Sequence, residues 1–113
     1  VRRVCSQCAE PMSGAEQAAI EAGLDPALAK TAKFMKGKGC ERCTQSGYKG
    51  RVGLFEVMEV NDVIRQMILD NVSTTQLRAQ AVADGMLTLR QCGLQKVCEG
   101  MTTVEEVVRE TVI

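Results

Sequence analysis

Two C-x-x-C pairs constrain this sequence more than any other feature. Cys5 and Cys8 form the first pair, Cys40 and Cys43 form the second, and 31 residues lie between the pairs. Two residues between thiolates let a tight turn direct both sulfurs at one metal ion, about 2.3 Å away in the case of zinc. Because the sequence contains no histidine, the pattern predicts a zinc site made of four cysteine thiolates.

Four thiolates fill the coordination shell of zinc, which is typical of a structural site and not of a catalytic one. Glycines at Gly37, Gly39 and Gly47 flank the second pair, where a tight turn needs backbone angles that residues with a Cβ resist. A redox dithiol is the main alternative, but it uses one C-x-x-C at a helix start and leaves the second pair unexplained. Iron held by four cysteines has compatible spacing and stays open.

The other two cysteines, Cys92 and Cys98, lie six residues apart in a helical pattern. That spacing puts them on different sides of a helix, so we expect core packing or incidental surface placement. Six cysteines would also fit three disulfides in a secreted protein, but the sequence shows no export signal and the paired spacing favours metal.

Composition and charge limit the classes of function. The 113 residues suit one modest domain, and 14 basic residues balance 14 acidic ones. The charge is uneven, because residues 1–51 carry nine basic and five acidic side chains and residues 52–113 carry the reverse. A nucleic-acid-binding domain is usually strongly basic, so the zero net charge weighs against one. No apolar run approaches the roughly 20 residues that span a bilayer, and we expect a soluble chain.

The expected fold class is α+β, in three segments. Residues 1–51 should form a tetracysteine zinc-binding unit with an insert of two short helices, capped by Ser13 with Glu16 and by Asp25 before a proline. Residues 52–61 have apolar side chains on both faces, which predicts a strand covered on both sides. A short strand at residues 1–4 is the other candidate for its pair, so further neighbours would have to come from outside this sequence.

Residues 62–113 change to a helical period and predict a bundle of four short amphipathic helices. Polar residues mark the expected helix starts, which are Asn61 or Asp62, Ser73 with Gln76, and Thr102 with Glu105. We find no phosphate-binding loop of the G-x-x-x-x-G-K-[ST] type and no set of catalytic residues. The sequence alone therefore predicts no catalytic site.

The order of the motifs resembles the C-terminal end of the bacterial secretion ATPases, the family of type II secretion and type IV pilus assembly ATPases. The segments that carry the resemblance are GKGCERCTQSGYKGRVGLFEVMEV and GMLTLRQCGLQKVCEGMTTVEEVVRET. The resemblance implies that Cys5, Cys8, Cys40 and Cys43 bind structural zinc. It also implies that the chain is a fragment of a RecA-like motor domain, with residues 52–61 returning to the sheet of that domain.

The family resemblance further implies a cytoplasmic homohexamer at the inner membrane, contacting a platform protein and powering pilus assembly. The pilus branch is preferred because of GMLTLRQCGLQKV, with type II secretion as the alternative. ATP and magnesium would bind upstream in the parent protein, so we do not expect this chain to hydrolyse ATP alone. Its basic residues Lys36, Lys38, Lys49 and Arg51 are candidates to meet an acidic platform surface or anionic lipid, or are simply solvated.

An autonomous zinc-knuckle module that binds nucleic acid is the alternative from another class. Basic residues surround Cys40 and Cys43, and Tyr48 offers one ring for stacking. Single-strand binders usually combine several rings with a continuous basic groove. One ring and zero net charge make this alternative the weaker one.

Overall fold

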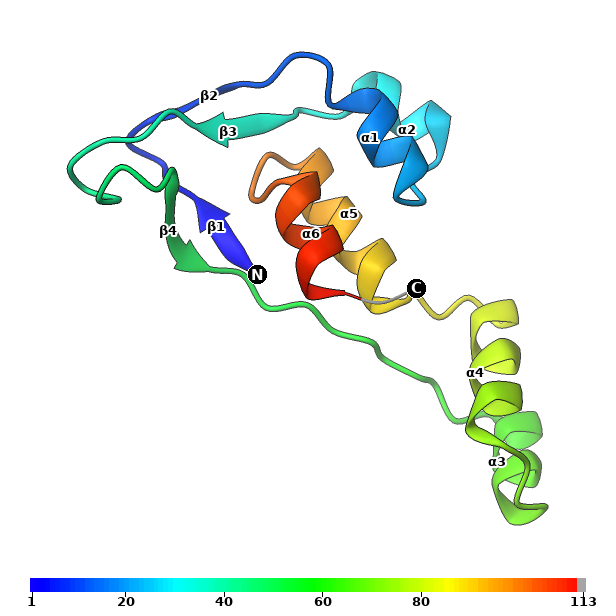
Figure 1. Ribbon diagram of the computed structural model, residues 1–113. Coiled ribbons are helices and arrows are strands. Elements are labelled where there is room, and N and C mark those ends of the chain that lie inside the picture. Colours follow the sequence, from blue (N-terminus) through cyan, green and yellow to red (C-terminus); the bar gives the residue numbers. More distant parts are fainter. Residues whose placement is uncertain (112–113) are drawn as a thin grey trace. The chain divides into compact units, whose positions relative to one another are not determined.

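The computed structural model describes residues 1–111 and shows an α+β chain of short helices and paired strands (Figure 1). Residues 112–113, which end the helix expected over 102–113, lie outside the described residues. The chain divides into two compact units. We call the first the cysteine unit, made of residues 1–54 and the chain from Leu89 onward, and the second the helical unit, made of residues 55–88.

Two antiparallel ribbons form the β-structure of the cysteine unit. Strand β1 (Arg2–Val4) pairs with β4 (Tyr48–Arg51), and β2 (Ala9–Pro11) pairs with β3 (Met35–Gly37). The first cysteine pair lies between β1 and β2, and the second lies between β3 and β4. Because β1 pairs with β4 and β2 pairs with β3, the two cysteine turns lie close together. The β2–β3 ribbon was not predicted, because three-residue strands leave no periodic signal.

Two helices form the insert, α1 (Glu16–Glu21) and α2 (Pro26–Thr31). The Asp25 cap of α2 is confirmed, since its Oδ1 accepts a hydrogen bond from the Ala27 N–H at 2.9 Å. The capping box predicted at Ser13 is wrong. Helix α1 starts after Ala15 and has no side-chain cap, so Ser13 lies two residues too early to reach the free N–H groups of its first turn.

Helices α5 (Leu89–Cys98) and α6 (Val104–Glu110) pack with the insert around a core of small side chains. The buried core residues are Ala15, Ala19, Ala22, Leu24, Ala29, Phe34, Leu94, Val97 and Val107. Gly93 permits close packing of α5 on α6, because an added Cβ would lie 2.7 Å from Cγ1 of Val107. A core this rich in alanine buries little apolar area, so we expect it to need additional stabilisation.

Polar contacts fix the start of α6 to β1. Glu106 is 3% exposed, and its carboxylate accepts hydrogen bonds from N, Nε and Nη2 of Arg2 at 3.0, 3.1 and 3.0 Å. Thr102 donates to the Arg2 carbonyl at 2.8 Å. The cap predicted at Thr102 with Glu105 is therefore wrong by one residue, and Thr103 caps the helix by accepting from the Glu106 N–H at 3.2 Å.

The strand predicted over residues 52–61 does not form. Strand β4 ends at Arg51, and residues 52–61 have no regular secondary structure. Val52 still donates to the Val1 carbonyl at 2.8 Å, but beyond that point no strand among residues 1–111 pairs with this segment. A strand needs hydrogen-bonded neighbours, which the described part of the chain does not provide. Phe55 and Val57 are 70% and 74% exposed.

The bundle predicted over residues 62–113 is divided between the two units. Helices α3 (Asp62–Leu69) and α4 (Thr74–Ala83) belong to the helical unit, whereas α5 and α6 belong to the cysteine unit. The caps at Asn61 and Ser73 are confirmed, the second as a reciprocal capping box with Gln76. Sequence periodicity identified the helices but could not show which element each apolar helix face would pack against.

The longest helices, α4 and α5, have ten residues, and none in the described part of the chain is long and apolar enough to cross a membrane.

Glu106→Gln should lower the free energy of unfolding by about 1–3 kcal/mol at neutral pH, because a buried acceptor of three hydrogen bonds loses its charge. Urea denaturation measures this change. Glu105→Gln, at an exposed position of the same helix, is the matched control and should be close to neutral.

The same pair predicts a pH dependence. Hydrogen bonds from Arg2 hold the pKa of Glu106 below its usual value, although burial opposes them. A carboxylate with a lowered folded pKa stabilises the protein above its unfolded pKa of about 4.3, and this stability is lost as the pH falls through the folded value. Glu106→Gln should therefore lose less stability than wild type between neutral and strongly acidic pH. An equal acid-induced loss would contradict the assignment.

Candidate metal centre

The four predicted cysteines meet in one cluster. The sulfurs of Cys5, Cys8, Cys40 and Cys43 all lie within 4.8 Å of one another. Three of the distances are 3.8 Å for Cys5–Cys40, 3.8 Å for Cys8–Cys43 and 3.7 Å for Cys40–Cys43. A tetrahedron with metal–sulfur bonds of about 2.3 Å has edges of about 3.8 Å. The cluster therefore has the dimensions of a tetrathiolate site, and the four cysteines are positioned to bind a metal ion.

Backbone hydrogen bonds hold the two cysteine turns against each other. Cys5 donates its N–H to the Gly47 carbonyl at 2.9 Å, and Lys38 donates to the Cys8 carbonyl at 3.0 Å. Within the second turn, Gln45 donates to the Cys40 carbonyl at 2.8 Å. The hydrogen bonds of Cys5 and Cys8 therefore join the first turn to residues beside the second turn, and they fix the distance between the two cysteine pairs.

Backbone N–H groups also point at the sulfurs. Gly39 donates to Sγ of Cys8, and Cys40 and Gly47 donate to Sγ of Cys43, each at 3.3 Å. Such contacts spread the negative charge of a thiolate and orient it toward a metal. These hydrogen bonds would hold the thiolates in place around a metal ion.

The thiols differ in pKa. Burial raises the pKa of Cys43, but the N–H groups of Cys40 and Gly47 outweigh it and lower the value to about 6. The Gly39 N–H lowers the pKa of Cys8, but burial and the three neighbouring thiols outweigh it and raise the value to about 11. Four thiolates this close repel one another, and a bound cation is what allows all four to lose their protons.

Close approach of two glycines completes the turns. An added Cβ on Gly37 would collide with the carbonyl of Gly47, and one on Gly47 would lie 2.6 Å from the carbonyl oxygen of Gly37. The special backbone angles predicted here are confirmed at Gly39 and Gly47, whose φ values are 104° and 82°. Gly37 has no positive φ and is required for the close approach instead. Thr44 and Gln45 adopt left-handed φ values of 53° and 66°, which the sequence did not reveal because neither residue type is typical of that region.

Comparison with known proteins identifies the family. The model of the type II/IV secretion system protein family matches residues 1–109. The chain belongs to this family. The predicted resemblance to the secretion ATPases is therefore confirmed.

Individual relatives match almost the whole chain. It is 41% identical over 112 residues to the type IV pilus assembly ATPase PilB of Thermus thermophilus, covering 99% of this chain and 13% of the relative. It is 39% identical to PilB of Myxococcus xanthus, covering 97% and 20%. It is 38% identical to the type II secretion system protein E of Pseudomonas aeruginosa, covering 98% and 22%. The chain thus spans between 13% and 22% of the length of these three relatives.

The remaining two cysteines of this secretion-family chain lie outside the cluster. Cys92 and Cys98 lie in α5 and are partly buried, and the metal-compatible group contains neither of them. Burial and the neighbouring Glu99 raise the pKa of Cys98. The prediction for both residues was core packing or incidental surface placement, and Cys98 packs against the buried core.

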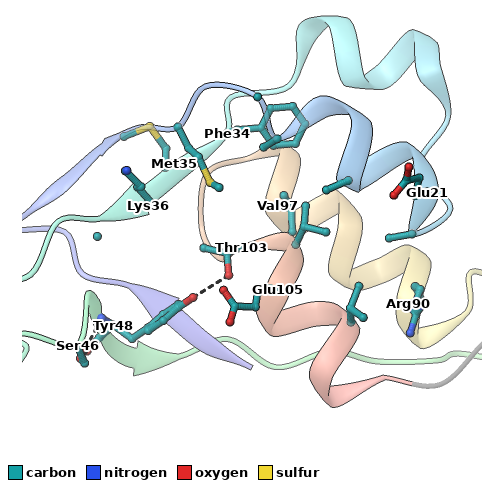
Figure 2. Close-up of a pocket in the computed structure, with 18 residues that line it drawn as sticks. Glu21, Phe34, Met35, Lys36, Ser46, Tyr48, Arg90, Val97, Thr103 and Glu105 are labelled. Carbon is teal, nitrogen blue, oxygen red and sulfur yellow. Dashed lines mark hydrogen bonds between the residues drawn. The ribbon is translucent and has the colours of Figure 1, made fainter.

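A groove of about 690 Å³ lies next to the cysteine turns, lined by α1, β3 and α6 (Figure 2). Its wall is mostly apolar, with Phe34, Met35 and Val97 among the lining residues, and no cysteine of the cluster lines it. Tyr48 crosses one end, where its hydroxyl is 2.8 Å from Oγ1 of Thr103 (Figure 2). Sequence reasoning missed this groove, because its walls come from segments far apart in the chain.

Gly37→Ala should lower the affinity for a divalent metal by at least about tenfold, because the added methyl separates the two cysteine turns. Titration with Co²⁺, whose tetrathiolate complex absorbs visible light, measures the affinity. Gly50→Ala is the control, because its φ is +85° but no atom lies within 4 Å of the added Cβ. The control should lose about 1–2 kcal/mol of stability and keep its metal affinity. Equal affinities in the two variants would contradict the packing argument.

Proposed function

We propose that this chain is the zinc-binding and C-terminal helical part of a type IV pilus assembly ATPase. The observation that carries the proposal is a cluster of four sulfurs with tetrahedral spacing, in a chain that is 41% identical to such an ATPase over 99% of its own length. An ATPase of type II secretion is the second candidate, since the chain is 40% identical to the type II secretion system protein E of Dickeya dadantii over 98% of its length.

The metal is zinc and its role is structural. Cys5, Cys8, Cys40 and Cys43 would supply all four ligands, leaving no open position for water or substrate. Bound zinc supplies folding free energy, about 10 kcal/mol or more in small zinc domains. The need for it is clear from the core, in which four of the nine buried residues are alanine. Zinc therefore makes a rigid body of a segment that its own core stabilises poorly.

In the parent protein, strands from outside this chain would pair with the exposed segment at residues 52–61. This segment has no regular secondary structure and exposes Phe55 and Val57, and the relatives are several times longer than this chain. We infer that its edges pair with strands of a RecA-like ATPase domain. ATP and magnesium would bind in that domain, and the parent would assemble as a hexamer at the cytoplasmic face of the inner membrane.

The cysteine unit would act as a rigid arm of that motor. Arg2 and Glu106 join β1 to α6, and Val4 adds a backbone hydrogen bond to Met101 at 2.8 Å. A displacement of α6 is therefore passed to β1 and on to the cysteine turns without a flexible linker. Such an arm suits contact with a neighbouring subunit or with an inner-membrane platform protein.

Two competing functions are less well supported. A nucleic-acid-binding knuckle would need Tyr48 for stacking, but Arg2 covers its ring at 4.3 Å from the centroid and Thr103 engages its hydroxyl. A redox dithiol would lie at a helix start, whereas both cysteine pairs follow β-strands. Both observations favour the structural metal site.

Elemental analysis of the purified chain should find one zinc ion per chain. Removal by a chelator should reduce the ordered structure of the cysteine unit, seen as a loss of circular dichroism signal, and added zinc should restore it. Cys40→Ser should abolish stoichiometric binding, whereas Cys92→Ser, outside the cluster, should retain it. Iron in place of zinc would change the metal assignment, and free or oxidised cysteines without metal would sink the structural-zinc proposal.

In the full-length protein, Cys40→Ser should abolish pilus assembly, because the arm loses its fixed shape. Piliation of a deletion strain complemented with each variant measures the effect, with Cys92→Ser as the matched control. Normal piliation accompanied by loss of type II secretion would assign the chain to the second candidate. Unchanged piliation and secretion in a variant that lacks zinc would rule out the rigid-arm role.

A further inference from the structure

We propose that the outer side of the β1–β4 ribbon, together with the adjoining cysteine turn, binds an acidic segment of a partner protein that carries at least one basic residue. We call this surface the basic face and define it as Arg3, Arg42 and Lys49. The proposal deepens the proposed function, because it rests on the same rigid arm and names the surface and the chemistry of its partner.

The strand register places these cations together. Val4 lies opposite Tyr48 in the ribbon and is 4% exposed, so this side of β1 faces the interior. The register shifts between the Arg2–Arg51 and Val4–Tyr48 pairs, because β4 has one extra residue there. Arg3 and Lys49 are the direct neighbours of Val4 and Tyr48, so alternation along each strand puts them on the opposite side, and both are exposed. Lys49 also donates from Nζ to the Arg42 carbonyl at 3.2 Å, which brings the cysteine turn to the same surface.

The cations of the basic face have no ionic partner within the described part of the chain. Two other basic residues among residues 1–54 do have one, since Arg2 pairs with Glu106 and Lys36 pairs with Glu10 at 3.7 Å. Lys36, a candidate from the sequence, is therefore partly neutralised. Arg3 and Arg42 were not among those candidates, and the fold is what groups them with Lys49.

The composition of the surface indicates a protein partner. No large apolar side chain is exposed between residues 36 and 51, so the surface offers nothing to insert into a bilayer. The nearby aromatic ring of Tyr48 lies on the Val4 side of the ribbon and is covered by Arg2, so it offers no ring for stacking on bases at the basic face. Arginine, in contrast, forms paired hydrogen bonds with carboxylates.

The carboxylate of Glu41 favours a protein partner over an anionic membrane or a nucleic acid. It is exposed and directly precedes Arg42. A uniformly anionic surface, such as a phosphatidylserine membrane or a nucleic-acid backbone, would repel this carboxylate. A protein segment can place a lysine or arginine opposite Glu41 while its acidic residues meet the basic face, and that pattern of charges fits the surface.

The first test uses the metal-loaded chain and a fluorescent Glu-rich peptide, with binding followed by anisotropy at low salt. Reversal of Arg42 and Lys49 together to Glu should weaken binding by about tenfold or more, because two attractions become repulsions. Reversal of Lys30 and Lys33 to Glu gives the same net charge at exposed positions of the insert and should change binding by less than about twofold. Equal weakening by both pairs of reversals, at unchanged metal content, would overturn the proposal.

The second test scans one lysine along the same peptide. One position should improve binding by about two- to fivefold, and Glu41→Gln should remove this improvement. Vesicles containing phosphatidylserine and single-stranded DNA are the competing probes, and tighter binding of either one than of the best peptide would overturn the choice of partner. None of these readouts depends on piliation, so failure here leaves the proposed function to its own tests.

Discussion

The meeting of two short β-ribbons at four sulfurs is the constraint on which the rest of the cysteine unit depends. The ribbons are three or four residues long, and such pairs are at best marginally stable in water. The contact between Gly37 and Gly47 lets their backbones approach until two sulfur pairs across the turns, Cys5–Cys40 and Cys8–Cys43, lie 3.8 Å apart. Without a metal, four thiols at this distance offer little stabilisation. With one, they form a cross-link between segments that are 31 residues apart in the sequence.

The cross-link reaches the helices through β1. Cys5 follows that strand directly, and its other residues supply Arg2 to the buried carboxylate of Glu106 and the Val4 N–H to Met101. Charge-assisted hydrogen bonds at a buried carboxylate are stronger than neutral ones, so this junction is better suited to keep α6 in place than the alanine-rich core alone. The position of α6 is therefore linked through β1 to the geometry of the cysteine cluster.

The sequence was informative where chemistry is local. Cysteine spacing identified the four cysteines that cluster, and the caps at Asp25, Asn61 and Ser73 were correct because each involves residues within one helical turn. It failed where the outcome depends on distant partners. Thr102 matched a cap pattern as well as Thr103 did, but its hydroxyl bonds to the Arg2 carbonyl, one hundred residues away. The apolar segment at residues 52–61 has strand composition, yet a strand also needs an edge to pair with, and composition cannot supply that.

Rigidity also decides how a surface with so few charges can recognise a partner. An exposed ion pair contributes about 0.2–1 kcal/mol, much of it offset by ordering long side chains. The basic face gains from a backbone that the cysteine turns hold in place and from the bond of Lys49 to the Arg42 carbonyl. Because these positions are fixed before binding, a partner loses less free energy to ordering them. A few correctly spaced charges then provide selectivity that a mobile basic loop of the same composition would lack.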